Sequence, residues 1–178
     1  TILGAGSTTI TAAQAGDSNY AAAISLPQTL TVDQASQAIT FAALPAKVYG
    51  DASFALAAAA SSGLTVSYES SNPAVATVSG STVTIVGAGS TTITASQAGD
   101  TNYSAATNVV QTLTVGQASQ AITFAALAAK TYEDVPFALN ATASSGLTVS
   151  YESSNPAVAM ISGSTVTILG AGSTTITA

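Results

Sequence analysis

Apolar and polar residues alternate over short stretches of this chain, and turn-forming residues separate the stretches. In 82–86, Val83 and Ile85 alternate with Thr82 and Thr84, which predicts a strand with one buried face and one face in water. No stretch combines a convincing helical period with capping residues, and the alanine-rich 57–60 is the one ambiguous segment. Over residues 34–116 the pattern predicts seven strands, at 38–42, 54–59, 64–69, 74–79, 82–86, 91–96 and 109–115.

The segments between these strands are rich in residues that reverse the chain direction. Glycine supplies positive φ, proline fixes φ, and serine or asparagine bonds to the nearby backbone. Within 64–69, Leu64, Val66 and Tyr68 are expected to share one face of a sheet. Turns are predicted at 61–63, 71–73, 79–81 and 87–89. Seven alternating strands in about eighty residues indicate an antiparallel sandwich of two sheets.

The chain repeats itself without insertions. The heptapeptide at 4–10 recurs at 87–93 and at 170–176, so the spacing is 83 residues both times (87 − 4 and 170 − 87). This spacing exceeds the usual units of solenoids and fits a small autonomous domain. The joint between units is the Val-x-Gln-Ala-Ser segment at 32–36 and 115–119. We therefore expect three tandem domains: 1–33 is the C-terminal part of one repeat, 34–116 is a complete repeat, and 117–178 is the N-terminal part of the next.

Two of these three domains, 1–33 and 117–178, contain only some of the strands expected for a repeat. Residues 117–178 stop before the counterpart of 109–115, which is expected to leave an unpaired sheet edge. Either the chain continues as a longer polymer, or residues 13–33 of a neighbouring chain supply the strand by β-augmentation. We favour the longer polymer, because residues 1–12 duplicate residues 167–178 and strand exchange does not need both copies.

Two motifs in each unit carry a resemblance to a known family. The first is Ser-Asn-Pro-x-Val-Ala-x-Val, at 71–78, and the second is Gly-x-Thr-x-Ile-x-Ala, at 89–95. The chain resembles the bacterial Ig-like repeat (Big) family, although Tyr68 and Tyr151 stand where many of its members carry tryptophan. The resemblance implies tandem immunoglobulin-like β-sandwiches of about seven strands each. It also implies a large extracellular protein of the bacterial cell surface, in which such modules act as stalks or adhesive arrays.

Composition and charge exclude several other classes of protein. The chain is 47% hydrophobic and 6% charged, with a net charge of −6, two lysines, and no arginine, histidine or cysteine. Two lysines one repeat apart cannot form the basic patch that a nucleic-acid binder needs, so we expect no nucleic-acid partner. Apolar runs are too short for a membrane helix, so we expect no membrane insertion. Zinc-thiolate sites and thiolate nucleophiles are also excluded by composition.

A calcium site is the most serious candidate among binding sites. Hard cations need several oxygen ligands in one loop, and the Gly-Asp-x-Asn-Tyr loops contain Asp17 with Asn19, and Asp100 with Asn102. One carboxylate per loop is few for calcium. We therefore favour an Asx-type turn, with Tyr20 and Tyr103 packed over the end of the sandwich, and we assign no metal and no cofactor.

Three further candidates have simpler structural interpretations. Lys47 and Asn72 are candidates for an isopeptide bond assisted by Glu69, but long charged side chains are usually solvated. The glycine-rich 87–91 lacks the Gly-Lys-Ser/Thr ending of a phosphate loop, so we interpret it as a turn. Threonine rows such as Thr82-x-Thr84 suit ice, glycans or O-linked sugars, yet they also form the ordinary polar face of a sandwich.

These observations favour a structural protein. We expect no enzyme and no catalytic residues, because the acid–base groups are limited to carboxylates, two lysines and tyrosines. The function we expect is a structural spacer or stalk, or an extracellular fibre segment, of a repetitive adhesin-like bacterial surface protein. Its partners are then neighbouring repeats of the same polymer, with surface glycans or other cells as further candidates. The alternative is a multivalent carbohydrate- or ice-binding adhesin array.

Overall fold

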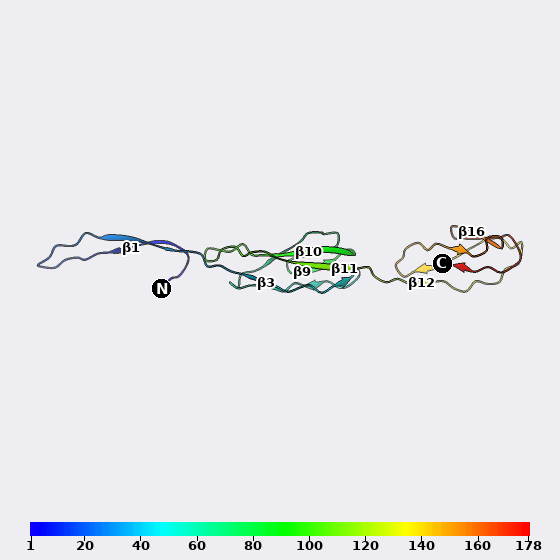
Figure 1. Cartoon of the computed structure of the whole chain (residues 1–178), viewed down its shortest axis with the longest axis horizontal. Coiled ribbons are helices and arrows are strands. Elements are labelled where there is room, and N and C mark those ends of the chain that lie inside the picture. The colour runs from blue at the N-terminus through cyan, green and yellow to red at the C-terminus, as the bar shows by residue number, and fades with distance from the viewer. The chain divides into compact units, whose positions relative to one another are not determined.

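The computed structural model describes residues 1–178 and contains strands, turns and loops but no helix. No element of the chain is therefore a helix of the length and apolarity that a membrane span requires. The chain divides into two compact units, Thr1–Ala118 and Ser119–Ala178, which are described separately below. The all-β fold class predicted from the alternation is confirmed (Figure 1).

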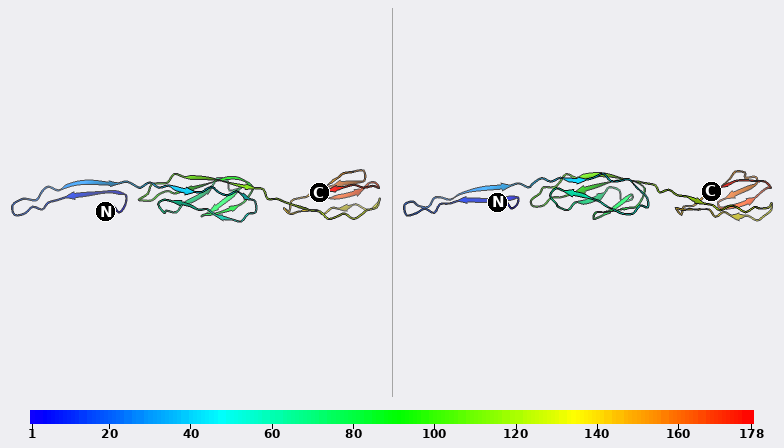
Figure 2. Two further views of the ribbon diagram at one scale, coloured as in Figure 1. Left: turned by 60° about the horizontal axis from the view of Figure 1, so that its bottom comes forward. Right: turned by 90° about the horizontal axis from the view of Figure 1, so that it is seen from below.

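Unit 1 begins with a hairpin of two long strands. Strand β1 (Gly6–Ala12) pairs antiparallel with β2 (Leu26–Val32), from Gly6↔Val32 to Ala12↔Leu26. Figure 2 shows this hairpin as a two-stranded ribbon without a third strand. Ile10 is 58% exposed, whereas Ile93, its counterpart one repeat later, is fully buried. The hairpin therefore corresponds to one strand pair of a repeat, with the face that would meet the sandwich core left open.

The rest of unit 1 is a complete repeat with strands in several small sheets. Four strands form the longest sheet, in the order β4-β11-β10-β7, three form β5-β9-β8, and two form β3-β6. The β10–β11 ladder has the same register as the β1–β2 hairpin, displaced by 83 residues. The bounds are β3 (Ile39–Phe41), β4 (Lys47–Val48), β5 (Phe54–Ala55), β6 (Ala58–Ala60), β7 (Ser67–Ser70), β8 (Ala76–Ser79), β9 (Thr82–Ile85), β10 (Gly89–Ser96) and β11 (Val109–Gly116).

One hydrophobic core holds the complete repeat together. Val83, Ile93 and Leu113, from β9, β10 and β11, are fully buried. Full burial of such a side chain contributes about 1.5–3 kcal/mol relative to exposure. Phe41 and Tyr68 pack edge to face beside them, with ring centroids 5.7 Å apart. The predicted alternation is confirmed in β9, where Thr82 and Thr84 are exposed and Val83 and Ile85 point inward.

The strand prediction was wrong in three places. The predicted strand 54–59 is two strands, because β5 pairs with β9 whereas β6 pairs with β3. Between them Leu56 is buried and donates its N–H to the Ser81 carbonyl at 2.7 Å, so the chain changes partners here. Strand β4 was missed, since two residues are too few for a pattern. The predicted 64–69 begins only at Ser67, although Leu64 and Val66 do alternate inward. The repeat consequently has nine short strands rather than seven.

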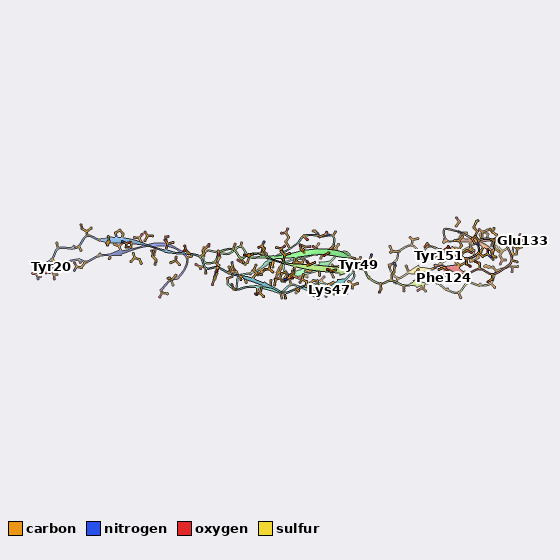
Figure 3. All side chains as sticks on the ribbon, in the orientation of Figure 1. Tyr20, Lys47, Tyr49, Phe124, Glu133 and Tyr151 are labelled. Carbon is orange, nitrogen blue, oxygen red and sulfur yellow. The ribbon has the colours of Figure 1, made fainter.

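Unit 2 contains counterparts of the strands from β3 to β10 except β4, which pairs with β11 in the complete repeat. Phe124 and Tyr151 pack edge to face at 5.8 Å and lie beside each other in Figure 3, as Phe41 and Tyr68 do in unit 1. Its buried core is limited to Leu139, Ala159 and Val166. The strands are β12 (Ile122–Thr123), β13 (Phe137–Ala138), β14 (Thr142–Ala143), β15 (Glu152–Ser153), β16 (Ala159–Ser162), β17 (Thr165–Ile168) and β18 (Ile176–Thr177).

Candidate functional site

The Gly-Asp-x-Asn-Tyr loop considered above for calcium is an Asx-type turn. The Asp100 Oδ1 atom accepts hydrogen bonds from the backbone N–H groups of Asn102 and Tyr103, both at 2.8 Å. Asp100 also donates its own N–H to the Tyr103 carbonyl at 2.9 Å. Gly99 has φ +81°, and a Cβ atom there would lie 2.3 Å from the Tyr103 carbonyl oxygen, so the loop requires glycine. This loop brings one carboxylate, already bonded to two amides, to the candidate site.

The equivalent loop in the hairpin has the same turn. Asp17 Oδ1 accepts the N–H groups of Asn19 and Tyr20 at 2.8 and 2.9 Å. No cluster of three or more acidic, histidine or cysteine side chains occurs in the structure. Tyr103 is half-buried in the complete repeat, whereas Tyr20 is 76% exposed and lies at the hairpin tip (Figure 3). Calcium binding by Asp17, Asn19, Asp100 and Asn102 stays the less favoured alternative, and the assignment of no metal stays a prediction.

The two asparagines of these loops differ in their contacts. The Asn102 side-chain oxygen accepts the backbone N–H of Ala5 at 3.0 Å, a hydrogen bond that joins the hairpin to the complete repeat. The Asn19 backbone N–H bonds to Asp17 within its own turn, and no partner is seen for its side chain. The sequence did not indicate this difference, because both loops have the same pattern and Ala5 lies 97 residues from Asn102.

The chain that enters the complete repeat is bonded to the same loop. Ala35 donates its N–H to the Asn102 carbonyl at 2.8 Å, and its own carbonyl accepts the Ser104 N–H at 2.9 Å. These bonds form an isolated parallel bridge between Ala35 and Tyr103. The Gln34 side-chain amide donates to the Asp100 carbonyl at 2.6 Å. The joint at 32–36 is thus fixed to the repeat by the backbone of Ala35 and the side chain of Gln34.

The Ser-Asn-Pro motif forms its own hydrogen-bond cluster around a buried threonine. Thr91 is 3% exposed, and its Oγ1 accepts the Asn72 N–H at 2.9 Å. The hydroxyls of Ser70 and Ser71 lie 2.9 and 3.2 Å from the same oxygen. Thr174 has the same three partners in unit 2. The period-two pattern contains the signal, since Thr91 shares a strand face with Ile93 and Ala95, whereas a threonine is usually expected on the polar face of a strand.

Comparison with known families places these motifs in context. A family model described as the intimin immunoglobulin-like domain matches residues 52–99 and 138–178, which together make up half of the chain. The chain belongs to the intimin immunoglobulin-like domain family. The match confirms a bacterial Ig-like adhesin domain and the sandwich fold, whereas membership of the Big family stays a prediction. No curated protein matches the chain.

The intimin-like repeats use their lysines for packing. The Lys47 ammonium nitrogen lies 5.0 Å from the centroid of the Phe54 ring, and Lys130 has the same position over Phe137. The Asn72 side-chain oxygen accepts the N–H of Ala74 within the Ser-Asn-Pro turn at 3.2 Å. The structure shows no contact between Lys47 and Asn72 of the kind that an isopeptide bond requires. The cation–π contact gives the lysine a structural role.

The glycine-rich segment of the intimin-like repeat is a turn between strands. Gly87 donates its N–H to the Val75 carbonyl at 3.1 Å, and β10 begins at Gly89. A phosphate loop is followed by a helix, whose N-terminus contributes to anion binding. Here a strand follows, in agreement with the turn predicted at 87–89.

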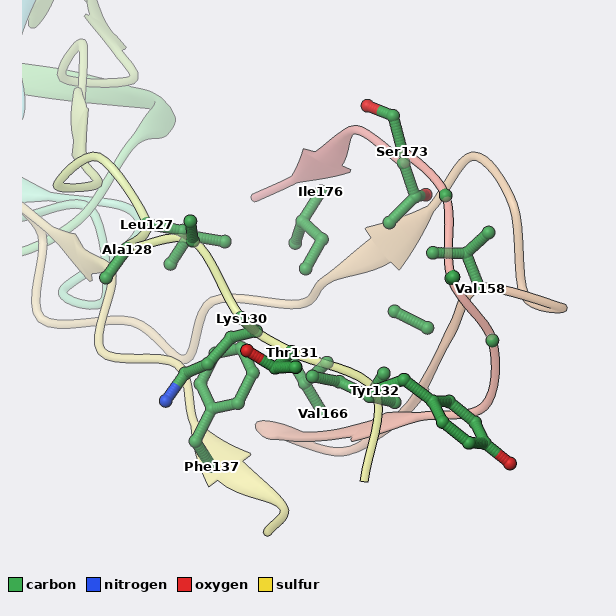
Figure 4. Close-up of a pocket in the computed structure, with 17 residues that line it drawn as sticks. Leu127, Ala128, Lys130, Thr131, Tyr132, Phe137, Val158, Val166, Ser173 and Ile176 are labelled. Carbon is green, nitrogen blue, oxygen red and sulfur yellow. The ribbon is translucent and has the colours of Figure 1, made fainter. Parts of the chain in front are cut away.

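Unit 2 contains an open hollow of about 700 Å³, shown in Figure 4. Leu127, Lys130, Phe137, Val166 and Ile176 are among the residues that line it. In the complete repeat, the counterparts of Leu127, Phe137, Val166 and Ile176 pack in the core that contains Leu113 and Val115 of β11. The counterpart of Lys130, Lys47, is paired with Val115 itself. The hollow is therefore the place that β11 fills in a complete intimin-like repeat, and we do not interpret it as a ligand pocket.

Proposed function

We propose that this chain is a spacer or stalk segment of a repetitive bacterial surface protein of the adhesin type, or a segment of an extracellular fibre. The observation that carries the proposal is the hydrogen-bonded joint at 32–36, where Gln34 and Ala35 fix the chain that enters the complete repeat to that repeat without a flexible linker. A Gly/Ser-rich linker would behave as a random coil and would not transmit a defined spacing. Membership of the intimin-like family supports the same role.

The repetition of the sequence supports a function that depends on the length of the protein. Residues 1–12 and 167–178 are identical, and the complete repeat and unit 2 differ at few positions. Near-identity is expected where the number of units matters more than any individual surface. The family consists of non-enzymatic structural domains, and the chain has no histidine, cysteine or arginine for acid–base or nucleophilic chemistry. We place the protein at the bacterial cell surface, with neighbouring repeats as its partners.

A series of lengthened chains tests this proposal. One, two or three extra copies of residues 34–116 are inserted at the joint after residue 116, and the contour length is measured by atomic force microscopy. Each copy should add the same increment, of at least about 26 Å, which is the length of a strand of eight residues. A length that stays constant or rises irregularly as copies are added would contradict a spacer function.

The alternative function, a multivalent carbohydrate- or ice-binding array, is favoured by one surface. Thr77, Ser79, Thr82 and Thr84 are exposed on β8 and β9 and form two cross-strand pairs of hydroxyl groups. In unit 2 the counterpart of Thr77 is Met160, which is 47% exposed and interrupts the row. A repeated binding surface would not be interrupted in this way, so we rank this function second.

A binding assay distinguishes the two functions. The 178-residue chain is applied to a glycan array and to an ice-affinity column, with the variant Thr84→Asp as the comparison. A spacer gives no signal in either assay. Retention that Thr84→Asp abolishes would establish the β8–β9 face as a binding site.

A further inference from the structure

We infer that the Asp100–Tyr103 loop is a docking site for the glycine-rich loop of the preceding repeat, with Asn102 as the residue that latches the two together. The inference rests on the proposed stalk function, which makes successive repeats permanent neighbours. It assigns a recognition role to a loop that was considered above only as a calcium candidate.

Three oxygen atoms of this one loop accept hydrogen bonds, one from the preceding hairpin and two from the joint that follows it. The Asn102 side chain accepts the N–H of Ala5, the Asn102 carbonyl accepts the N–H of Ala35, and the Asp100 carbonyl accepts the side-chain amide of Gln34. Ala5 lies in the loop before β1, and Gln34 and Ala35 follow β2. The loop thus bonds to the preceding hairpin at Ala5 and to the joint at Gln34 and Ala35, which restrains rotation about the joint as well as bending.

The fit between the two loops is close at the glycine. A Cβ atom on Gly4 would lie 2.9 Å from the Asn102 side-chain oxygen, closer than real Cβ contacts come. Any side chain at position 4 would therefore displace Asn102 from Ala5. The Asx turn at Asp100 fixes the backbone of Asn102, so the main chain that carries this side chain is in position before docking.

Both halves of the latch recur with the repeat. The Gly-Ala-Gly segment at 4–6 recurs at 87–89, where Gly89 pairs with Val115 near the end of the last strand. The acceptor loop lies where the chain enters the repeat, beside Ala35. Each repeat consequently carries a donor loop at its exit and an acceptor loop at its entry. Such a heterologous, head-to-tail contact propagates along a fibre without limit.

Distance measurements between spin labels test the latch. The chain has no cysteine, so Thr29→Cys on β2 and Thr82→Cys on β9, both exposed, attach one label on each side of the joint. In the presence of a chelator, pulsed electron resonance should give one narrow distance distribution. Asn102→Ala removes one hydrogen bond and should raise the population of undocked distances about fivefold.

Two control variants make the result specific. Asn19→Ala changes the equivalent position of the hairpin loop, which has no partner across the joint, and should leave the distribution unchanged. Asn102→Asp keeps an oxygen that accepts the Ala5 N–H and should restore the narrow distribution. The thermal unfolding of all variants is recorded to show that the repeat is intact.

The outcomes separate the latch from the stalk function. A distribution that is equally narrow in Asn102→Ala and in the parent chain, or equally broadened by Asn19→Ala, overturns the latch. A broad distribution in the parent chain also overturns it, whereas the regular length increments of the lengthened chains still support the stalk. Irregular increments together with a narrow distribution would overturn the stalk and retain the latch.

Discussion

At the scale of single residues, differences between the repeats show where the fold is under strain. Glu133 has φ 74°, in the left-handed region that side chains rarely adopt, and its counterpart Gly50 has φ 95°. The turn is otherwise the same in both copies. Asp51 Oδ2 accepts the N–H of Val48 at 2.9 Å, and Asp134 Oδ2 accepts the N–H of Thr131 at 2.9 Å. The turn geometry therefore imposes the conformation on Glu133.

Glu133→Gly should stabilise unit 2 by about 1 kcal/mol, because glycine adopts this φ without steric cost. Gly50→Glu should destabilise the complete repeat by a similar amount. No atom lies within 4 Å of a Cβ built at Gly50, so the backbone conformation alone accounts for the loss. Chemical denaturation of both variants measures the changes, and changes of the same sign in the two variants would contradict the explanation.

Tyr68 has a polar role that phenylalanine cannot replace. Its hydroxyl oxygen accepts the N–H of Ala58, in β6, at 2.8 Å, while its ring packs on Phe41. Tyr68→Phe leaves this partly buried N–H without a partner and should cost about 1–3 kcal/mol. For a domain of this size, the melting temperature should fall by roughly 4–8 °C per kcal/mol. Differential scanning calorimetry measures the fall, and an unchanged melting temperature would show that water replaces the hydroxyl.

The calcium hypothesis makes a separate prediction at Asp100. If the carboxylate serves only the Asx turn, Asp100→Asn keeps the acceptor oxygen and should have little effect. Asp100→Ala should destabilise the repeat by about 1 kcal/mol. Melting curves with calcium and with a chelator should coincide for the parent chain. A melting temperature that rises with calcium, and no longer does so in Asp100→Asn, would establish a metal site.

At the scale of strands, the alternation of apolar and polar residues predicted the strand bounds wherever all residues of the predicted strand belong to one sheet. The strands at 82–86, 91–96 and 109–115 were predicted nearly at their observed bounds, because apolar residues face one continuous core. The stretch 54–59 was not, since nothing in its residues shows that β5 and β6 belong to different sheets. Pairing partners are set by tertiary packing, which local periodicity does not contain.

The candidate site was predictable to a similar extent. The Asx turn follows from the local Asp-x-Asn-Tyr pattern, and the structure has it in both loops. The contact between Asn102 and Ala5 joins residues 97 positions apart. It depends on how one repeat meets the next, and local patterns carry no information about that geometry.

The absence of a counterpart of β11 from unit 2 gives a prediction for this element. A copy of residues 96–116 appended after Ala178 should fill the hollow, since the counterparts of Leu113 and Val115 then enter the core. Each fully buried side chain contributes about 1.5–3 kcal/mol. Hydrogen exchange of β15 to β18 should slow accordingly. The same segment with serine at these two positions is the control, and equal protection by both segments would contradict this explanation.

At the scale of the whole chain, the two units differ in how much core they contain. The hydrophobic cluster of the complete repeat includes eleven buried residues, and that of unit 2 includes three. Stability depends on buried apolar area, so the two units should unfold at different temperatures. This difference provides an independent check on the division of the chain into domains.

Heating the chain should therefore produce two transitions, with unit 2 unfolding first. Tyr68→Phe should lower only the upper transition, and Tyr151→Phe, which removes the same hydroxyl from Ala141 in unit 2, should lower only the lower one. Calorimetry resolves both. A single transition that shifts equally in the two variants would show that the units unfold cooperatively.

The position of β11 in the sheet has a consequence for biosynthesis. This strand is the last of its repeat, yet it lies between β4 and β10. Because a polypeptide is synthesised from its N-terminus, a repeat cannot complete this sheet until residue 116 has been synthesised. Until then, the edges of β4 and β10 that pair with β11 remain without a partner strand. Repeats therefore complete their folding one after another in the order of synthesis. Each folded repeat then separates the unpaired strands of the next repeat from the repeats synthesised earlier.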